Sequence, residues 1–174
     1  MNILQISVFL ENRAGQLAEI TRLLAEAGVD IRALSIAETS DYGLARMIVS
    51  DANAASSVLL HHGDILSMTP VYAVEVPDSP GGLAELLGLL ADNNIDVEYM
   101  YSLFFHAPGK ACMVLRITNE PMFLSVLGTN RVRIVGMEEL GLKYAHKQAP
   151  LRNSIAGLLH ILSLAVGTPV PGCP

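Results

Sequence analysis

Asparagine or aspartate stands three residues before a glycine in two similar stretches of the chain, ENRAGQLAEI and PDSPGGLAEL. The pairs are Asn12 with Gly15 and Asp78 with Gly81, and a helical apolar pattern starts at each glycine. The N-terminus of a helix offers unpaired N–H groups and a partial positive charge, which suit a carboxylate. A glycine there lacks a Cβ and lets a ligand approach the backbone.

Acceptors for a cation stand close to both glycines. Asn12 and Asp78 come just before the predicted helices, and Asp30 and Asp96 come just after them. In the second stretch, Ser79 suits a helix N-cap and Pro80 the first helical position. A helix N-terminus that binds a carboxylate, next to side chains that accept from an ammonium group, fits a free amino acid. Because Asn12 is neutral and Asp78 is charged, the two sites need not have equal affinity.

The two stretches belong to an internal repeat with an offset of 66 residues. Nine positions of the first copy match the second, eight of them by identity and one by an exchange of Asn for Asp. The first-copy positions are Asn12, Gly15, Leu17, Ala18, Glu19, Leu23, Leu24, Ala25 and Asp30. An ungapped register of this length predicts two copies of one module.

Each copy has the same predicted order of elements, βαββαβ. Asp51 and Asn119 suit the N-caps of the second helices, and Gly63 and Gly128 suit their ends. Gly28 and Asn94 are the residue types that end a helix in the left-handed conformation. The expected strands cover 3–10, 31–38, 44–49 and 65–68, then 71–76, 97–105, 111–117 and 132–135. This order predicts an α+β fold with two ferredoxin-like βαββαβ modules, each an antiparallel sheet with its helices on one face.

We place the first module at residues 1–69 and the second at residues 70–141. Residues 142–174 form a C-terminal extension without a counterpart in the first copy. Its segment 151–166 reads as an apolar helix, and the irregular sequence GTPVPGCP follows. Since an exposed apolar helix is a liability, we expect the extension to pack onto the protein or onto a second subunit.

The two stretches, each followed by a helix and then by GVDI or NIDV, resemble the ACT domain family over residues 3–140. The resemblance implies a tandem ACT domain protein: a regulatory module that senses small molecules, mostly amino acids, beside enzymes of amino-acid metabolism. It also implies effector sites where two ACT domains meet. The first set of implied contacts is Asn12, Arg13, Ala14 and Gly15, with Asp78, Ser79, Pro80 and Gly81. The second set is Asp30 and Ile31, with Asp96 and Val97.

Each of these residues also has a purely structural interpretation. Gly15 and Gly81 could let helix and strand pack closely, and Asn12 and Asp78 could be simple turn or capping residues. The two later aspartates could merely start strands, and Arg13 could be an exposed charge. A structural subunit that associates with an enzyme of amino-acid metabolism without binding any ligand is therefore the alternative function.

Composition and spacing exclude several other functions. No Ser, His and Asp stand at a persuasive catalytic spacing, and His61–His62 has no spaced partner, so we expect no enzyme, no metal and no cofactor. A net charge of −6 disfavours nucleic acid. The apolar segment 155–166 is too short to cross a membrane, and no secretory signal is visible, so we expect a cytoplasmic protein. A hydrophobic content of 51% favours a homo-oligomer, most simply a dimer.

Overall fold

The computed structural model describes residues 2–11, 13–38, 42–104 and 107–143, and the predicted helix at 151–166 lies outside them. These residues form six strands and four helices in the predicted α+β order. The strands are β1 (Ile3–Glu11), β2 (Ile31–Glu38), β3 (Tyr42–Val49), β4 (Leu66–Pro77), β5 (Val97–Ser102) and β6 (Lys110–Ile117). The helices are α1 (Gln16–Glu26), α2 (Ala52–His62), α3 (Gly82–Asp92) and α4 (Glu120–Thr129).

All strand pairs are antiparallel, in the order β2-β3-β1-β4-β6-β5. Two strands that we expected to be separate are the single strand β4. Its first half pairs with β1, up to Val71 opposite Ile3, and its second half pairs with β6 from Tyr72 onward. The module boundary that we place between residues 69 and 70 therefore falls inside one strand, which ties the two repeats together.

The last predicted strand, at 132–135, is only a short segment beside β4. It makes one bridge, Ile134 to Val74, with hydrogen bonds from Val135 N to Ala73 O (2.8 Å) and from Glu75 N to Arg133 O (2.9 Å).

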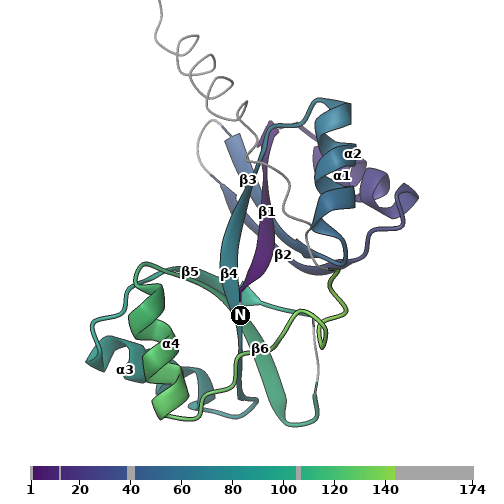
Figure 1. Cartoon of the computed structure of the whole chain (residues 1–174). Coiled ribbons are helices and arrows are strands. Elements are labelled where there is room, and N and C mark those ends of the chain that lie inside the picture. Colours follow the sequence, from purple (N-terminus) through teal and green to yellow (C-terminus); the bar gives the residue numbers. More distant parts are fainter. Residues whose placement is uncertain (1, 12, 39–41, 105–106, 144–174) are drawn as a thin grey trace, which may run out of the picture.

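Three apolar clusters build the interior in layers. The first joins α1 and α2 to β1 and β3, and the third joins α3 and α4 to β4 and β6. The two halves of the strand order, one from each module, are called the two sheets below. The second cluster lies between the faces of these sheets that the helices leave open, where Ile3, Ala33 and Ile48 meet Tyr101 and Val114. Figure 1 shows the result: the strands lie between the α1–α2 pair and the α3–α4 pair.

Aromatic residues of β5 fill this contact between the sheets. The sequence predicts that Tyr99 and Tyr101 pack against another sheet of the same kind, and both contact the first repeat. Phe104 does not follow that prediction, because 64% of it is exposed. Phe105 lies outside the described residues.

The helix ends follow most of the predicted capping residues. Asp51 and Asn119 accept hydrogen bonds from Ala54 N and Met122 N, at 2.9 and 3.2 Å. Gly28 (φ 68°), Asn94 (φ 51°) and Gly63 (φ 99°) take the left-handed conformation after their helices. The prediction for Gly128 is wrong: it lies inside α4, and Arg131 (φ 55°) takes the left-handed position.

Gly82 is the glycine that close packing requires. A Cβ there would lie 2.2 Å from the Pro77 carbonyl oxygen, so Gly82→Ala must push the start of α3 off β4. We expect this variant to lower the free energy of unfolding by about 1–3 kcal/mol. The matched control is Gly88→Ala in the same helix, where a Cβ would meet nothing within 4 Å. The control should raise stability by about 0.5–1 kcal/mol. Thermal or urea unfolding checks both, and equal effects would contradict the packing argument.

Candidate functional site

Two glycine turns lead into α1 and α3. Gly15 (φ 90°, ψ −13°) and Gly81 (φ 97°, ψ −21°) are the N-caps, and their carbonyls accept the first helical hydrogen bonds, from Glu19 N and Glu85 N, both 2.9 Å. The predicted capping roles of Ser79 and Pro80 are therefore wrong. Gly82 N donates to Ser79 O (3.0 Å), which closes a turn with proline and a left-handed glycine at its centre.

The conformation of these turns explains the two glycines. Both need a positive φ, which side chains disfavour, and neither supports close packing, because a Cβ at either would meet nothing within 4 Å. A glycine N-cap also has no side chain to bind the first N–H groups, whereas Asp51 and Asn119 cap α2 and α4. The helices at the predicted site thus begin without the side-chain caps that the other two have.

The two turns differ in what surrounds them. Arg13 lies 2.8 Å from Glu19 and 3.3 Å from Glu11, and its hydrogen bond with Glu19 raises the pKa of Arg13 and lowers that of Glu19. The first turn is therefore flanked by an ion-pair cluster of its own. Asp78 at the second turn is exposed, and its N–H donates to Gly109 O (3.1 Å). Asn12 lies outside the described residues.

The helix starts differ as well. Gln16, the first residue of α1, is 8% exposed, and its Oε1 has no hydrogen-bond partner within the part of the chain that the structure describes. The same repeat position holds Gly82, which packs directly on Pro77. The two copies consequently present different surroundings to anything that binds at the turn.

The second set of predicted contacts lies at the start of β2 and of β5. The Asp30 backbone exchanges hydrogen bonds with Ser50, from Asp30 N to Ser50 Oγ (2.9 Å) and from Ser50 N to Asp30 O (2.8 Å). Ile31 pairs with Val49 and Val97 with Ile117. Because β1 and β2 both run antiparallel to β3, the Asp30 end lies opposite the glycine turn within one module. A site that uses both sets must draw them from different modules.

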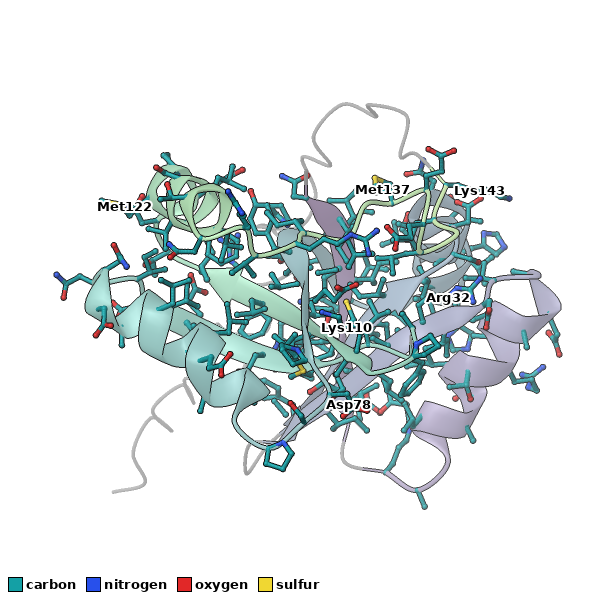
Figure 2. The ribbon with its side chains drawn as sticks, turned by 90° about the horizontal axis from the view of Figure 1, so that it is seen from below. Arg32, Asp78, Lys110, Met122, Met137 and Lys143 are labelled. Carbon is teal, nitrogen blue, oxygen red and sulfur yellow. The ribbon has the colours of Figure 1, made fainter. Side chains whose placement is uncertain are left out.

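The β5–β6 connection contacts both the second glycine turn and the start of β2, which come from different modules. It meets the second turn through the bond from Asp78 N to Gly109 O, and it meets β2 through Phe104 N, which donates to Arg32 O (2.7 Å). Asp78, Lys110 and Arg32 lie between the two pairs of helices in Figure 2. In the described ranges no hydrogen bond or ion pair joins Asp78–Gly81 directly to Asp30–Ile31, and none joins Arg13–Gly15 to Asp96–Val97.

Arg32 and Lys110 are the residues that sequence reasoning missed. Arg32 Nη1 lies 3.1 Å from Asp30, its side chain is 37% exposed, and its Nε is buried without a partner among the described residues. Lys110 Nζ lies 3.5 Å from Glu75. Comparison of the two copies could not identify Arg32 as a site residue, because Glu98 occupies the matching position. Lys110 follows Gly109, which accepts the bond from Asp78 N, whereas Arg32 meets the β5–β6 connection through its backbone carbonyl.

A small hollow elsewhere contains none of the predicted residues. Pro70, Tyr72, Arg116 and Glu120 line it, with Ile117 and Thr118. Three of its polar side chains already have partners within the chain: Tyr72 donates a short hydrogen bond to Glu120, and Arg116 donates to Pro70 O (2.9 Å). The hollow therefore offers less to a ligand than the glycine turns.

Other chemistries find little support in the described ranges. They contain no group of three His, Cys, Asp or Glu side chains placed to hold a metal ion. No described helix is both long and apolar enough to span a bilayer. Cys112 is buried, and burial raises the pKa of its thiol to about 12, which disfavours the reactive thiolate.

Comparison with known proteins gives the family. A model described as "ACT domain pair" matches residues 1–142. No curated protein matches. Protein BT0572 from Bacteroides thetaiotaomicron is 36% identical, with a TM-score of 0.75, over 81% of this chain and 96% of that one.

Two more distant structures share the fold. The ligand-free regulatory subunit of aspartate kinase from Thermus thermophilus is 14% identical, with a TM-score of 0.56, over 74% of this chain and 90% of that one. Aspartate kinase from Synechocystis is 19% identical, with a TM-score of 0.51, over 84% of this chain and 27% of that one. The match of the family model over residues 1–142 confirms the predicted resemblance, and the chain belongs to the family of ACT domain pairs.

Proposed function

We propose that this protein is a non-catalytic regulatory protein that binds a small effector, an amino acid, where its two ACT modules meet. The observation that carries the proposal is the second glycine turn. There α3 starts without a side-chain cap, and the β5–β6 connection joins this turn to the Asp30–Arg32 strand of the other module.

In this proposal different parts of the site bind the two charged groups of the ligand. The N–H groups at the start of α3, assisted by Arg32, bind the carboxylate. The carboxylates of Asp78 and Asp30 bind the ammonium group. Ser79, Pro80 and Gly81 shape the turn, and Ile31 starts the strand opposite. The matching residues of the other copy, Arg13, Ala14 and Gly15 with Asp96 and Val97, form a second and weaker site.

One observation favours the alternative function, a structural subunit that binds an enzyme of amino-acid metabolism without a ligand. Arg13 and Glu19 occupy the surroundings of the first turn with the protein's own charges. If the second turn also binds nothing, the modules serve assembly alone, as a homodimer or beside an enzyme. A ligand screen separates the two functions.

We expect one or more amino acids to raise the melting temperature. At a concentration about 100 times the dissociation constant, binding adds about 2.7 kcal/mol, or roughly 5–10 °C for a chain of this size. Asp78→Ala should abolish the shift. The matched control, Asp92→Ala, removes an exposed carboxylate at the other end of α3 and should retain it. Gly81→Val is a poorer test, because φ at Gly81 is 97° and a valine would strain the turn itself.

The screen also has a result that supports the alternative. If no amino acid at millimolar concentration shifts the melting temperature, the proposed effector site is wrong. If both aspartate variants keep a shift, an amino acid binds, but away from the second turn.

A further inference from the structure

Part of the open sheet face of the first module is apolar. Ile6, Val8, Ala45 and Met47 point to α1 and α2, so their neighbours along the strands point to the other face. On that face Phe9 stands opposite Leu44, and Leu44 stands opposite Ala37 on the next strand. We call this row of three residues, which crosses β1, β3 and β2, the Phe9 row. All three are partly exposed.

The second module covers only the other half of this face. Tyr99 and Tyr101 bind Gln5, and the guanidinium of Arg46 lies 4.2 Å from the centre of the Tyr99 ring. Arg46 stands opposite Ser7 on β1, one row before Phe9. Among the described residues, the contact between the sheets, whose apolar cluster contains Ile3, Ala33 and Ile48, therefore does not include the Phe9 row.

The described chain ends close to this sheet. Lys143 N donates to Ser50 O (2.8 Å), and Lys143 Nζ lies 3.1 Å from Asp51. Lys143 is on the first-module side in Figure 2. Ser50 directly follows β3, and Leu44 is six residues earlier, or about 20 Å along the strand. A fully extended segment 144–150 would span up to about 29 Å, which is long enough for residue 151 to reach the Phe9 row.

The next segment has a matching apolar face. On a helix, the residues of 151–166 place one continuous apolar stripe along one side, with Asn153 and His160 opposite and Arg152 at its edge. Leu164 lies on the polar side, beside Asn153 and His160. The stripe contains Leu151, Ile155, Leu158, Leu159, Leu162, Ala165 and Val166. The family model stops at residue 142, so this segment is additional to the ACT pair and needs a surface to cover its stripe.

We propose that residues 151–166 form an amphipathic helix that docks on the Phe9 row of the same chain. The helix covers the half of the open face that the second module leaves uncovered. Because β1 ends at Glu11, two residues beyond Phe9, the docked helix lies next to the first glycine turn. Nothing in this proposal depends on ligand binding at either turn.

Hydrogen exchange of the full chain tests the proposal. Amides of 151–166 should exchange at least about ten times more slowly than in an unfolded peptide. Leu44→Asp should remove this protection, whereas Leu60→Asp, a matched change at a 43% exposed leucine on α2, should keep it. Unprotected amides in the wild type, or protection that survives Leu44→Asp, would overturn the proposal.

A substitution in the extension tests the same contact without the risk that Leu44→Asp misfolds the first module. Leu158→Asp alters only the extension, so the exchange of α1 and α2 should stay as in the wild type while 151–166 loses its protection. The protection should also be independent of protein concentration. Protection that rises with concentration, together with a dimer mass in sedimentation, would assign the surface to a second copy and overturn docking within one chain.

Discussion

Replacing Gln5 with alanine is expected to lower the free energy of unfolding by about 3 kcal/mol, because it breaks a closed polar network between the two sheets. Gln5 is fully buried. Its Nε2 donates to Ser7 Oγ (2.9 Å) and to Tyr99 Oη (3.0 Å), and its Oε1 accepts from Tyr101 Oη (2.9 Å). An alanine leaves the two tyrosine hydroxyls without this partner and leaves a void between the modules.

Tyr101→Phe is the matched partial change, since it removes one donor and keeps the ring. We expect it to cost about 1–2 kcal/mol. Urea unfolding of both single variants and of the double variant gives the coupling energy, which should exceed about 1 kcal/mol for groups in direct contact. A loss below about 1 kcal/mol for Gln5→Ala would mean that the sheets do not meet around this side chain.

Stability should fall steeply at alkaline pH. Burial raises the pKa of the Cys112 thiol from 9.0 to about 12, and burial with the bond to Glu120 raises that of Tyr72 from 10.0 to about 12. Both groups are neutral when protonated, and the folded state holds that proton more tightly. Their contribution is therefore complete below the unfolded pKa values and is lost as the pH rises toward 12. Each group contributes a slope of about 1.4 kcal/mol per pH unit.

Cys112→Val separates the two groups, because it keeps an apolar side chain of similar size and removes the thiol. Between pH 9 and 10 the wild type should lose stability through Cys112, whereas the variant should lose much less. Above pH 10 both should fall through Tyr72 and through Tyr101, whose pKa is also raised by burial. Urea unfolding across this range measures the slopes, and identical curves for the two proteins would refute the role of the thiol.

The two modules could be predicted from the internal repeat, because the residues that define the helix ends act on their immediate sequence neighbours. Gly28 and Asn94 occupy the same position with the two residue types that suit it best, and both take the left-handed conformation. Asp51 and Asn119 cap their helices for equally local reasons. Each of these outcomes depends on a few neighbouring residues, which the sequence displays directly.

The contact between the modules was less predictable, because it depends on differences between the copies. The covered face carries Gln5 and Arg46 in the first copy and Val71 and Cys112 at the same positions in the second. The sequence indicated that Tyr99 and Tyr101 would meet another sheet, but it could not identify Gln5 as their partner. The fusion of two strands into β4 is likewise a tertiary feature, since Thr69 and Pro70 read locally as a break.

At the candidate site, the sequence identified the glycine positions, but the structure gives a different physical reason for them. Gly81 appeared as a helical residue that admits a ligand, but it precedes the helix and is required by a φ of 97°. The glycine required by close packing is its neighbour Gly82. Arg32 has no counterpart in the repeat, and among the described residues the bond from Phe104 N to Arg32 O relates it to the connection that meets the second turn.

Two-dimensional amide NMR of the isotopically labelled full chain, titrated with the proteinogenic amino acids, tests the central claim most directly. We predict that an effector changes the amide shifts of Gly81–Glu85 at the start of α3 and of Arg32 across the module contact, more strongly than those of α2 and α4. Spectra that no amino acid changes, or changes confined to residues away from both glycine turns, would contradict an effector site at this junction.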